Sequence, residues 1–363
     1  MTDANAWLTR FLAGDARALA RGLSWLEAGD PRGDALLAGA RAATRERPGA
    51  ARLIGLTGAP GAGKSTLADR LIEAWRARGQ RVAVLAVDPS SPFTGGALLG
   101  DRVRMTRWAG DDGVFVRSMA SRGRTGGLAP ATLDALALLA AFGFEVVLLE
   151  TVGVGQAEVD VAAVADTTVV TLAPGLGDDV QAAKAGLMEI ADVFALTKAD
   201  RPGAERLARD VRDAIGLRSA LDGHAAVWRP AVVMLAAGAD PADLPPTLAA
   251  DGGIAELIGA MDAHAAHLRR SGEDRARRAA RARLAVGLRA QATLQVALAG
   301  LPGERWDGVA AGRTAIDDLV REALAVALRR APGGDEATAA GEGTGGLPAR
   351  ARRLGRPPGP QAD

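Results

Sequence analysis

The segment GAPGAGKST (residues 58–66) has the residue types and spacing of a polyphosphate-binding loop. It fits the pattern G-x-x-x-x-G-K-[ST] from Gly58 to Ser65, follows an apolar run and leads into a helix-forming segment. A strand, a glycine loop and a helix N-terminus aim backbone N–H groups and the positive end of the helix dipole at one point. Lys64 is placed to reach the β- and γ-phosphates, and the Ser65 hydroxyl to bind Mg²⁺. The sequence therefore predicts a nucleoside triphosphate site, the alternative being a glycine turn that binds nothing. The predicted nucleotide-binding residues of this loop are Gly58, Ala59, Pro60, Gly61, Ala62, Gly63, Lys64, Ser65 and Thr66.

Acidic residues follow two other apolar runs, where Mg²⁺ ligands are expected. Asp88 ends the run at 81–87, and Asp101 lies on the long polar segment after it. Glu150 ends the run at 145–150, with Gly153 three residues later and Gln156 nearby. An acid and a following glycine at this point suit Mg²⁺ and the γ-phosphate, and a glutamine can orient the attacking water. A turn residue or a solvent-facing glutamine is the alternative for Asp101 and Gln156. These residues complete the predicted catalytic and metal-binding set.

The segment TKAD (residues 197–200) predicts that the base is guanine. Nucleotide-binding loops that read guanine commonly carry N-K-x-D, in which the aspartate accepts from the base N1–H and amino group while the lysine stem lies along the ring. Asp200 and Lys198 fit those roles, and adenine would leave the carboxylate unpaired, which favours GTP over ATP. Thr197 stands where the asparagine amide usually ties the base loop to the phosphate loop, so a weaker tie is expected.

Apolar runs alternate with helical segments and predict the elements that position these residues. The pattern indicates an α/β fold, a doubly wound and mainly parallel sheet of the P-loop NTPase class with helical extensions at both ends. Such a sheet binds ligands beyond the carboxyl ends of its strands, where the motifs fall. The predicted strands lie at 52–57, 81–87, 114–118, 145–150, 167–172, 192–197 and 231–235.

The flanking segments predict helices. Residues 4–48 indicate two amphipathic helices broken near 29–34, residues 253–299 a long helix or a helical hairpin, and residues 314–330 one more helix. We expect the N-terminal helical segment at 1–50, the P-loop domain at 51–250, a helical arm at 251–330 and a tail without fixed structure at 331–363.

Composition narrows the classes of partner. Basic and acidic residues number 44 and 43, so no net field recruits nucleic acid or an acidic membrane. The chain has no cysteine, which fits a reducing compartment, and no apolar run is long enough to span a membrane; a cytoplasmic protein is expected. The arginine-rich block at 269–289 lacks aromatic residues and is read as a solvated or partner-facing helix rather than a nucleic-acid contact. His264 and His267 have helical i, i+3 spacing, but no third metal ligand is evident nearby.

Together these motifs resemble one family, the methylmalonyl-CoA mutase-associated GTPases, also called MeaB or ArgK-like. The resemblance covers residues 50–300 and lies in GAPGAGKST, VDPSSPFTGGALLGDRVRM, RSMASRGRTGGLAPAT, ETVGVGQAEVDVA, PGLGDDVQAAKAGLMEIAD and TKAD. It implies a P-loop domain of the signal-recognition and nitrogenase type, and a C-terminal arm that forms a homodimer. It further implies a GTP-hydrolysing chaperone of an adenosylcobalamin-dependent acyl-CoA mutase, which gates cofactor loading and protects the mutase.

By the same resemblance, Ser65, Asp88, Asp101 and Glu150 contact Mg²⁺, and a partner-responsive switch includes Asp178, Gln181 and Lys184. The segment after the last strand lacks the serine-alanine pair that usually closes over guanine O6, so the backbone near Ala236 and Ala237 is expected to serve. The expected ligands are GTP or GDP with Mg²⁺, and the expected activity is GTP hydrolysis. A small-molecule kinase and an interaction module with negligible hydrolysis remain the alternatives.

Overall fold

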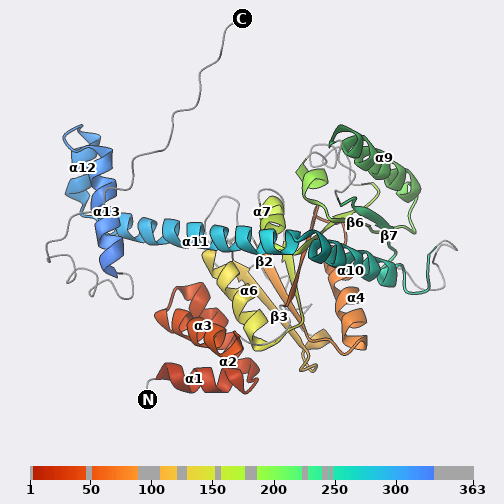
Figure 1. The fold of residues 1–363 in the computed structure, drawn as a ribbon, viewed down its shortest axis with the longest axis horizontal. Helices are drawn as coiled ribbons and strands as arrows, with labels where there is room; N and C mark the ends of the chain where they lie inside the picture. The colour runs from red at the N-terminus through yellow and green to blue at the C-terminus, as the bar shows by residue number, and fades with distance from the viewer. Residues whose placement is uncertain are drawn as a thin grey trace, which may run out of the picture. The chain divides into compact units, whose positions relative to one another are not determined.

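The seven predicted apolar runs form one parallel sheet, with the strand order β3-β2-β4-β1-β5-β6-β7 (Figure 1). Every strand pair in it is parallel, so the predicted fold class is confirmed. The strands are β1 Arg52–Gly58, β2 Val82–Asp88, β3 Val114–Ala120, β4 Val146–Thr151, β5 Thr167–Leu172, β6 Val193–Leu196 and β7 Ala231–Met234. The computed structural model describes residues 3–45, 51–88, 107–120, 129–151, 157–175, 186–222, 228–238, 244 and 248–330.

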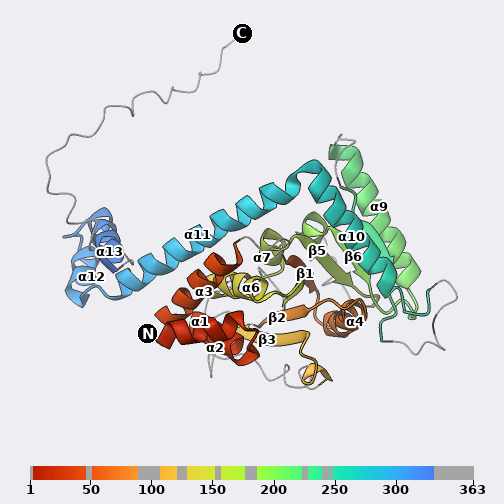
Figure 2. The same ribbon diagram turned by 60° about the horizontal axis from the view of Figure 1, so that its bottom comes forward.

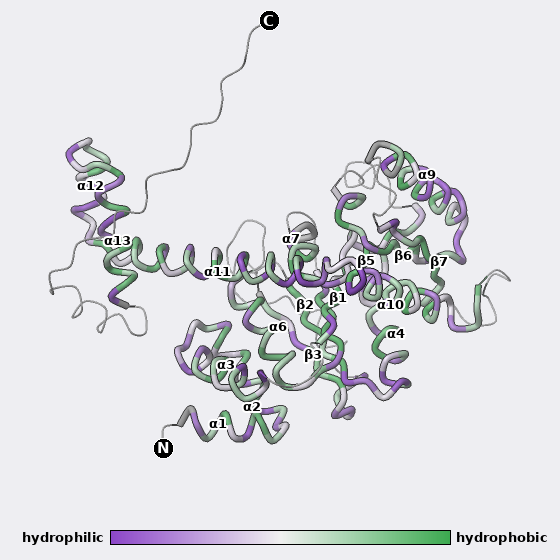
Figure 3. Tube along the Cα trace, viewed as in Figure 1, coloured by the Kyte–Doolittle hydropathy of each residue, from purple (hydrophilic) through white to green (hydrophobic). Residues whose placement is uncertain are grey.

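Helices cover both faces of this sheet, which is why its strands are apolar on both sides. Strands β4 and β5 are buried at every position. One face packs against α4 (Lys64–Ala77) and α10 (Ile254–Ser271). The other face packs against α6 (Pro130–Phe142) and α7 (Ala157–Val164), with α9 (Ala204–Asp222) over β6. Figure 3 shows the hydrophobic residues concentrated along the central strands.

Three helices, not the predicted two, precede the sheet: α1 (Asp3–Leu12), α2 (Ala16–Ala28) and α3 (Pro31–Thr44). The break near 29–34 is confirmed, since Asp30 caps α3 and Pro31 begins it. The prediction missed an earlier break, at which the Asp15 side chain accepts from Arg17 N and caps α2. Helices α2 and α3 lie beside α6, Phe11 of α1 contacts Phe142 of α6, and the apolar residues of all three share the core of α6 (Figure 2).

The C-terminal segment is also helical. Gly272, at φ +77°, separates α10 from α11 (Glu273–Ala299), and α12 (Gly303–Ala310) and α13 (Ile316–Arg330) follow. The chain divides into two compact units, Met1–Leu288 and Arg289–Asp363. The finer boundaries predicted at residues 50 and 250 stay predictions, and the predicted tail from Ala331 lies outside the described residues. Within the described ranges no single helix is long and apolar enough to cross a membrane; one pair, α11 and α12, passes that test only across a 94° bend.

Two arginines of α11 are paired with aspartates that precede strands. Arg277 donates to both oxygens of Asp192, at 2.9 and 2.8 Å, and Arg281 pairs with Asp166. The same carboxylates also hold the sheet, because Asp192 accepts from Thr168 N at 2.8 Å and Asp166 accepts from Leu53 N at 2.9 Å. Part of the arginine-rich block is therefore engaged inside the molecule. We call Asp166, Asp192, Arg277 and Arg281 the carboxylate clamp.

His264 lies beside this clamp and is completely buried. Its Nδ1 is 2.9 Å from the Thr167 hydroxyl, and its Nε2 is 3.3 Å from Asp192. The ring of Trp228 packs at 4.9 Å from that of His264. His264 is therefore part of the buried core, and no cluster of three metal-ligating side chains is found among the described residues.

Burial gives His264 an expected effect on acid stability. Loss of solvation lowers the pKa of His264 to about 4 from an ordinary value of 6.5, against the opposing attraction of Asp192. Between these pH values the unfolded chain binds the proton and the folded chain does not. The free energy of unfolding therefore has its full value, as far as His264 is concerned, above about pH 6.5. It falls as the pH is lowered towards about 4, by up to about 3 kcal/mol.

We expect His264→Gln to unfold with a shallower pH dependence of stability between pH 6.5 and 4.5 than the wild type. Urea unfolding at each pH measures it. The control is His267→Gln on the same helix, which keeps His264 and should keep the wild-type slope. Equal slopes for the His264 variant and the wild type would contradict this assignment.

Candidate functional site

The glycine loop joins β1 to α4 in the conformation that the motif predicts. Gly61 and Gly63 have φ of +74° and +83°, a region that residues with a side chain rarely adopt. At Gly58 an added Cβ would lie 2.2 Å from the Thr171 carbonyl oxygen of the neighbouring strand β5. The sheet and the loop conformation thus require these glycines, and the N-terminus of α4 faces the space that the loop encloses.

The Lys64 side chain folds back over this loop. Its ammonium group donates to Gly58 O at 2.6 Å and to Ala59 O at 3.1 Å, and the residue is 7% exposed. A buried ammonium needs such partners, since its desolvation is costly. The geometry places one cation beside the backbone that is predicted to cradle phosphates.

The structure brings Ser65 and Glu150 together. The Ser65 hydroxyl donates to Glu150 Oε1 at 2.9 Å, and Glu150 is 2% exposed. Register explains the meeting, because Glu150 lies opposite Leu56 of β1 and Ala86 of β2. Asp88 ends β2, so its backbone lies at the same edge of the sheet. The predicted residues Asp101, Gly153, Gln156, Asp178, Gln181 and Lys184 lie outside the described residues.

The TKAD loop contacts the phosphate loop directly. Thr197 donates its hydroxyl hydrogen to Ala62 O at 2.6 Å, and Lys198 Nζ donates to Gly61 O at 2.8 Å. Lys198 has φ +55°, an uncommon value for a residue with a side chain. Asp200 is exposed at the end of the loop. The Thr197 hydroxyl thus ties the two loops together, and the weaker tie expected relative to asparagine stays a prediction.

The segment after β7 also reaches this edge. Ala236 N donates to Gly252 O at 3.1 Å, so that N–H is already engaged. An added Cβ on Gly238 would lie 3.6 Å from the Thr66 side chain, which places this segment beside the first turn of α4. Of the two alanines predicted near the base, Ala237 is the better candidate donor to guanine.

Sequence reasoning missed one pair beside Ser65. Trp108 Nε1 donates to Asp69 at 3.1 Å, and both residues line a small cavity of about 20 Å³ together with Ser65 and Glu150. A signal was present, since Asp69 follows Ser65 by four residues and shares its helix face. Asp69 thus anchors Trp108 next to the predicted metal ligands.

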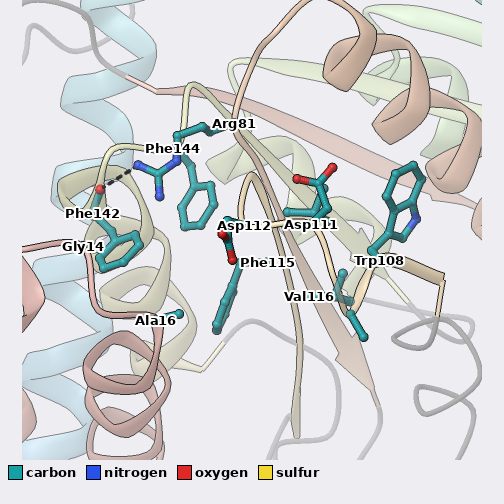
Figure 4. Close-up of a pocket in the computed structure, with 12 residues that line it drawn as sticks. Gly14, Ala16, Arg81, Trp108, Asp111, Asp112, Phe115, Val116, Phe142 and Phe144 are labelled. Carbon is teal, nitrogen blue, oxygen red and sulfur yellow. Dashed lines mark hydrogen bonds between the residues drawn. The ribbon is translucent and has the colours of Figure 1, made fainter.

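A larger cavity, of about 710 Å³, lies at the start of β3 and contains none of the predicted site residues (Figure 4). Phe115, Phe142 and Phe144 form its apolar part, and the Arg81 guanidinium lies 4.9 Å from the Phe144 ring centre. Arg76 binds Asp111 through two hydrogen bonds and holds the pKa of that carboxyl below its usual value. Because β2 and β3 begin here, this cavity is at the sheet edge opposite the phosphate loop.

Comparison with known proteins identifies the family. Residues 19–300 match the family described as "Methylmalonyl Co-A mutase-associated GTPase MeaB". This chain belongs to the MeaB family. It is a P-loop GTPase, and guanine nucleotide is its ligand class.

Individual relatives agree with this membership. A Pyrococcus abyssi protein named as a GTPase is 47% identical over 73% of this chain and 77% of its own length. GTPase ArgK of Escherichia coli is 40% identical over 53% of this chain and 58% of its own length. The mouse "Methylmalonic aciduria type A homolog, mitochondrial" is 39% identical over 51% of this chain and 44% of its own length. A crystal structure of "LAO/AO transport system kinase" shares the fold, with TM-score 0.59 and 22% identity over 89% of this chain and 98% of that one.

Removal of the loop cation should abolish tight GTP binding by this MeaB-family protein. We expect Lys64→Ala to lower GTP affinity by at least about 10-fold, because a charge-assisted contact to phosphate is lost. Titration with a fluorescent GTP analogue measures this. Arg70→Ala on the exposed side of the same helix removes an equal charge and should bind as the wild type does. Full GTP turnover by Lys64→Ala would refute the site.

Proposed function

We propose that this MeaB-family GTPase is a Mg²⁺-dependent chaperone of an adenosylcobalamin-dependent acyl-CoA mutase, gating cofactor loading and protecting the mutase. The observation that carries the proposal is the meeting of the phosphate loop, the Ser65–Glu150 pair and the TKAD loop at one sheet edge in a chain of the mutase-associated family. We place this function in the cytoplasm, as the absence of cysteine suits a reducing compartment.

The oxygen groups at this edge suit Mg²⁺. Ser65 and Glu150 lie in contact, and Asp88 ends the adjacent strand. Hydroxyl and carboxylate oxygens match a hard cation that keeps water and phosphate oxygens among its ligands, so a closed cage of protein carboxylates is not needed. In this proposal Ser65, Glu150 and Asp88 would hold Mg²⁺, with Asp101 as a further ligand, and the charge of the bound ion would offset that of the phosphates.

The side chains and backbone groups of the protein would then have separate roles in GTP binding and hydrolysis. Lys64 and the loop N–H groups stabilise negative charge on the transferred phosphoryl group and the leaving group. Asp200 accepts from guanine N1–H and the amino group, Lys198 lies along the base, and Ala237 N–H donates to O6. Gly153 and Gln156 bind the γ-phosphate and orient water, while Asp178, Gln181 and Lys184 respond to the mutase.

Hydrolysis should be slow alone and faster with the mutase. We expect a cognate mutase to raise the GTP turnover number by at least about 10-fold, because ordered switch groups stabilise charge in the transition state. Phosphate release with purified partners measures it, with Lys64→Ala as the inactive control. Unchanged turnover with every adenosylcobalamin-dependent mutase of the same cell would refute the chaperone role, and transfer of the phosphoryl group to a small molecule would indicate a kinase instead.

A homodimer through the C-terminal helices is part of this proposal. Four large apolar side chains at four-residue spacing are exposed on α13: Ile316, Val320, Leu324 and Leu328. Its other face is buried against α11, through Leu319, Ala323 and Ala327. Trp306 of α12 is exposed as well. A row of exposed apolar side chains on a helix that packs through another face is typical of a protein interface, and we propose a second copy as its occupant.

Charge on this stripe should separate the copies. We expect Leu324→Glu with Leu328→Glu to yield monomers, since two carboxylates would be buried without partners. Light scattering after size-exclusion chromatography reports the mass. Leu217→Glu, at an exposed position of α9, is the matched control and should leave the mass unchanged. A monomeric wild type would refute the dimer directly.

A further inference from the structure

The strand at one end of the sheet, β3, has a neighbour on one side only. It pairs with β2 over its whole length, and no other strand pairs with it among the described residues. Strand β4 is buried at every position, whereas residues 114–118 of β3 are half-buried. The free side of such a strand is a template for an additional strand. We propose that β3 is a docking site, to which a partner protein adds one extended segment with basic and apolar side chains.

The hydrogen-bond pattern shows which backbone groups of β3 face outward. Val82 N of β2 donates to Gly113 O at 2.8 Å, so the odd-numbered residues of β3 face β2. Backbone groups alternate along a strand, and those of the even-numbered residues therefore face away from the sheet. The N–H of Val114 is engaged, since it donates at 2.9 Å to a carbonyl of the preceding turn. Within the described part of the chain, no partner is found for Val114 O or for the backbone groups of Val116 and Ser118.

The cavity of about 710 Å³ at the start of β3 extends around this free edge. The side chain of Phe115 packs on the α6 face of the sheet, and those of Val114 and Val116 pack on the α4 face. All three residues line the cavity, so it must pass the edge of the strand that carries them. Figure 4 shows Phe115 on one side and Val116 with Trp108 on the other. An added strand would direct its alternate side chains towards these two groups.

The part of the cavity on the α6 face is aromatic. The ring centres of Phe115 and Phe144 lie 6.1 Å apart, and the ring of Phe142 stacks on that of Phe144 at 5.6 Å. Phe115 is half-buried and lines the cavity, so part of its apolar surface is accessible to a ligand. Burial of an aliphatic or aromatic side chain against it would remove apolar surface from water on both partners. The residue of the partner segment that faces this group is therefore expected to be apolar.

The charge of the cavity favours a basic partner. Arg76 neutralises Asp111 through two hydrogen bonds, of 2.9 and 2.8 Å. The Arg81 guanidinium lies over two phenylalanine rings, with centroids at 5.3 and 4.9 Å. Asp112 lines the cavity, is exposed, and has no ion pair among the described residues. A lysine or arginine of the partner would pair with this carboxylate, which contributes to specificity more than to affinity.

Short peptides that combine apolar residues with one charged type are the probe for this site. Fluorescence polarisation measures the binding of labelled nine-residue peptides, with either lysine or glutamate as the charged residue, to the full chain. We expect the lysine peptide to bind the wild type about 5-fold more tightly than the glutamate peptide. Asp112→Lys should reverse this preference. Asp210→Lys, the same change at an exposed position of α9, is the matched control and should preserve it.

The backbone contact is tested on both partners. N-methylation of every second residue of the lysine peptide removes N–H donors from one of its edges and should abolish binding. Val116→Pro removes an outward N–H from an edge strand, where proline is tolerated, and should weaken binding about 5-fold. Val116→Thr keeps the N–H and should bind as the wild type does. Melting temperature shows whether each variant is folded.

Three results would overturn the inference. They are a folded wild type that binds no peptide, equal affinities for the lysine and glutamate peptides, and full binding of the N-methylated peptide. If Val116→Pro does not fold, the N-methylated peptide still tests the backbone contact. A lower mass of Val116→Pro in light scattering would assign the edge to a second copy of this chain and would overturn the assignment to a partner protein. None of these measurements depends on GTP, so their outcome is independent of the proposed function.

Discussion

The passage of β1 through a glycine loop into α4 is the constraint on which the rest of the structure depends. The strand lies near the middle of the sheet, between β4 and β5, so the loop emerges where neighbouring strands also end. Close approach of Gly58 to Thr171 O leaves no room for a side chain, and the loop then turns through left-handed glycines. The buried side chain of Lys64 folds back over the loop and donates to Gly58 O. The position of the phosphate loop at this edge of the sheet therefore follows from the strand order.

The strands and motif residues were predictable because each has a signal within a short stretch of sequence. Runs that are apolar on both faces predict buried parallel strands, and all seven are present. Each residue type in the pattern around Lys64 has a known physical role in phosphate binding. The break before α2 was missed because both short helices are amphipathic, and only a few residues, including Gly14 at φ +83° and the Asp15 cap, separate them. Residues outside the described ranges, such as Gln156, stay predictions.

Contacts between distant backbone and side-chain groups were not predictable in the same way. Thr197 stands where asparagine is usual, and the sequence pattern alone implies a weaker tie between the TKAD loop and the phosphate loop. The partner of its hydroxyl is a main-chain carbonyl, which carries no residue-type signal. The ion pair between Asp192 and Arg277 was not predictable for a similar reason. A sequence rich in arginine indicates a solvated helix face, and only the fold shows that an aspartate lies beside it.

Asp192 of the carboxylate clamp and the TKAD loop lie at the two ends of one very short strand. Asp192 immediately precedes β6, Val193–Leu196, and Thr197 immediately follows it. A fully buried four-residue strand hydrogen-bonded on both sides is a stiff connector. Arg277 of α11 contacts Asp192 at one end of this strand, and the TKAD loop begins at its other end, so four buried residues connect the two features.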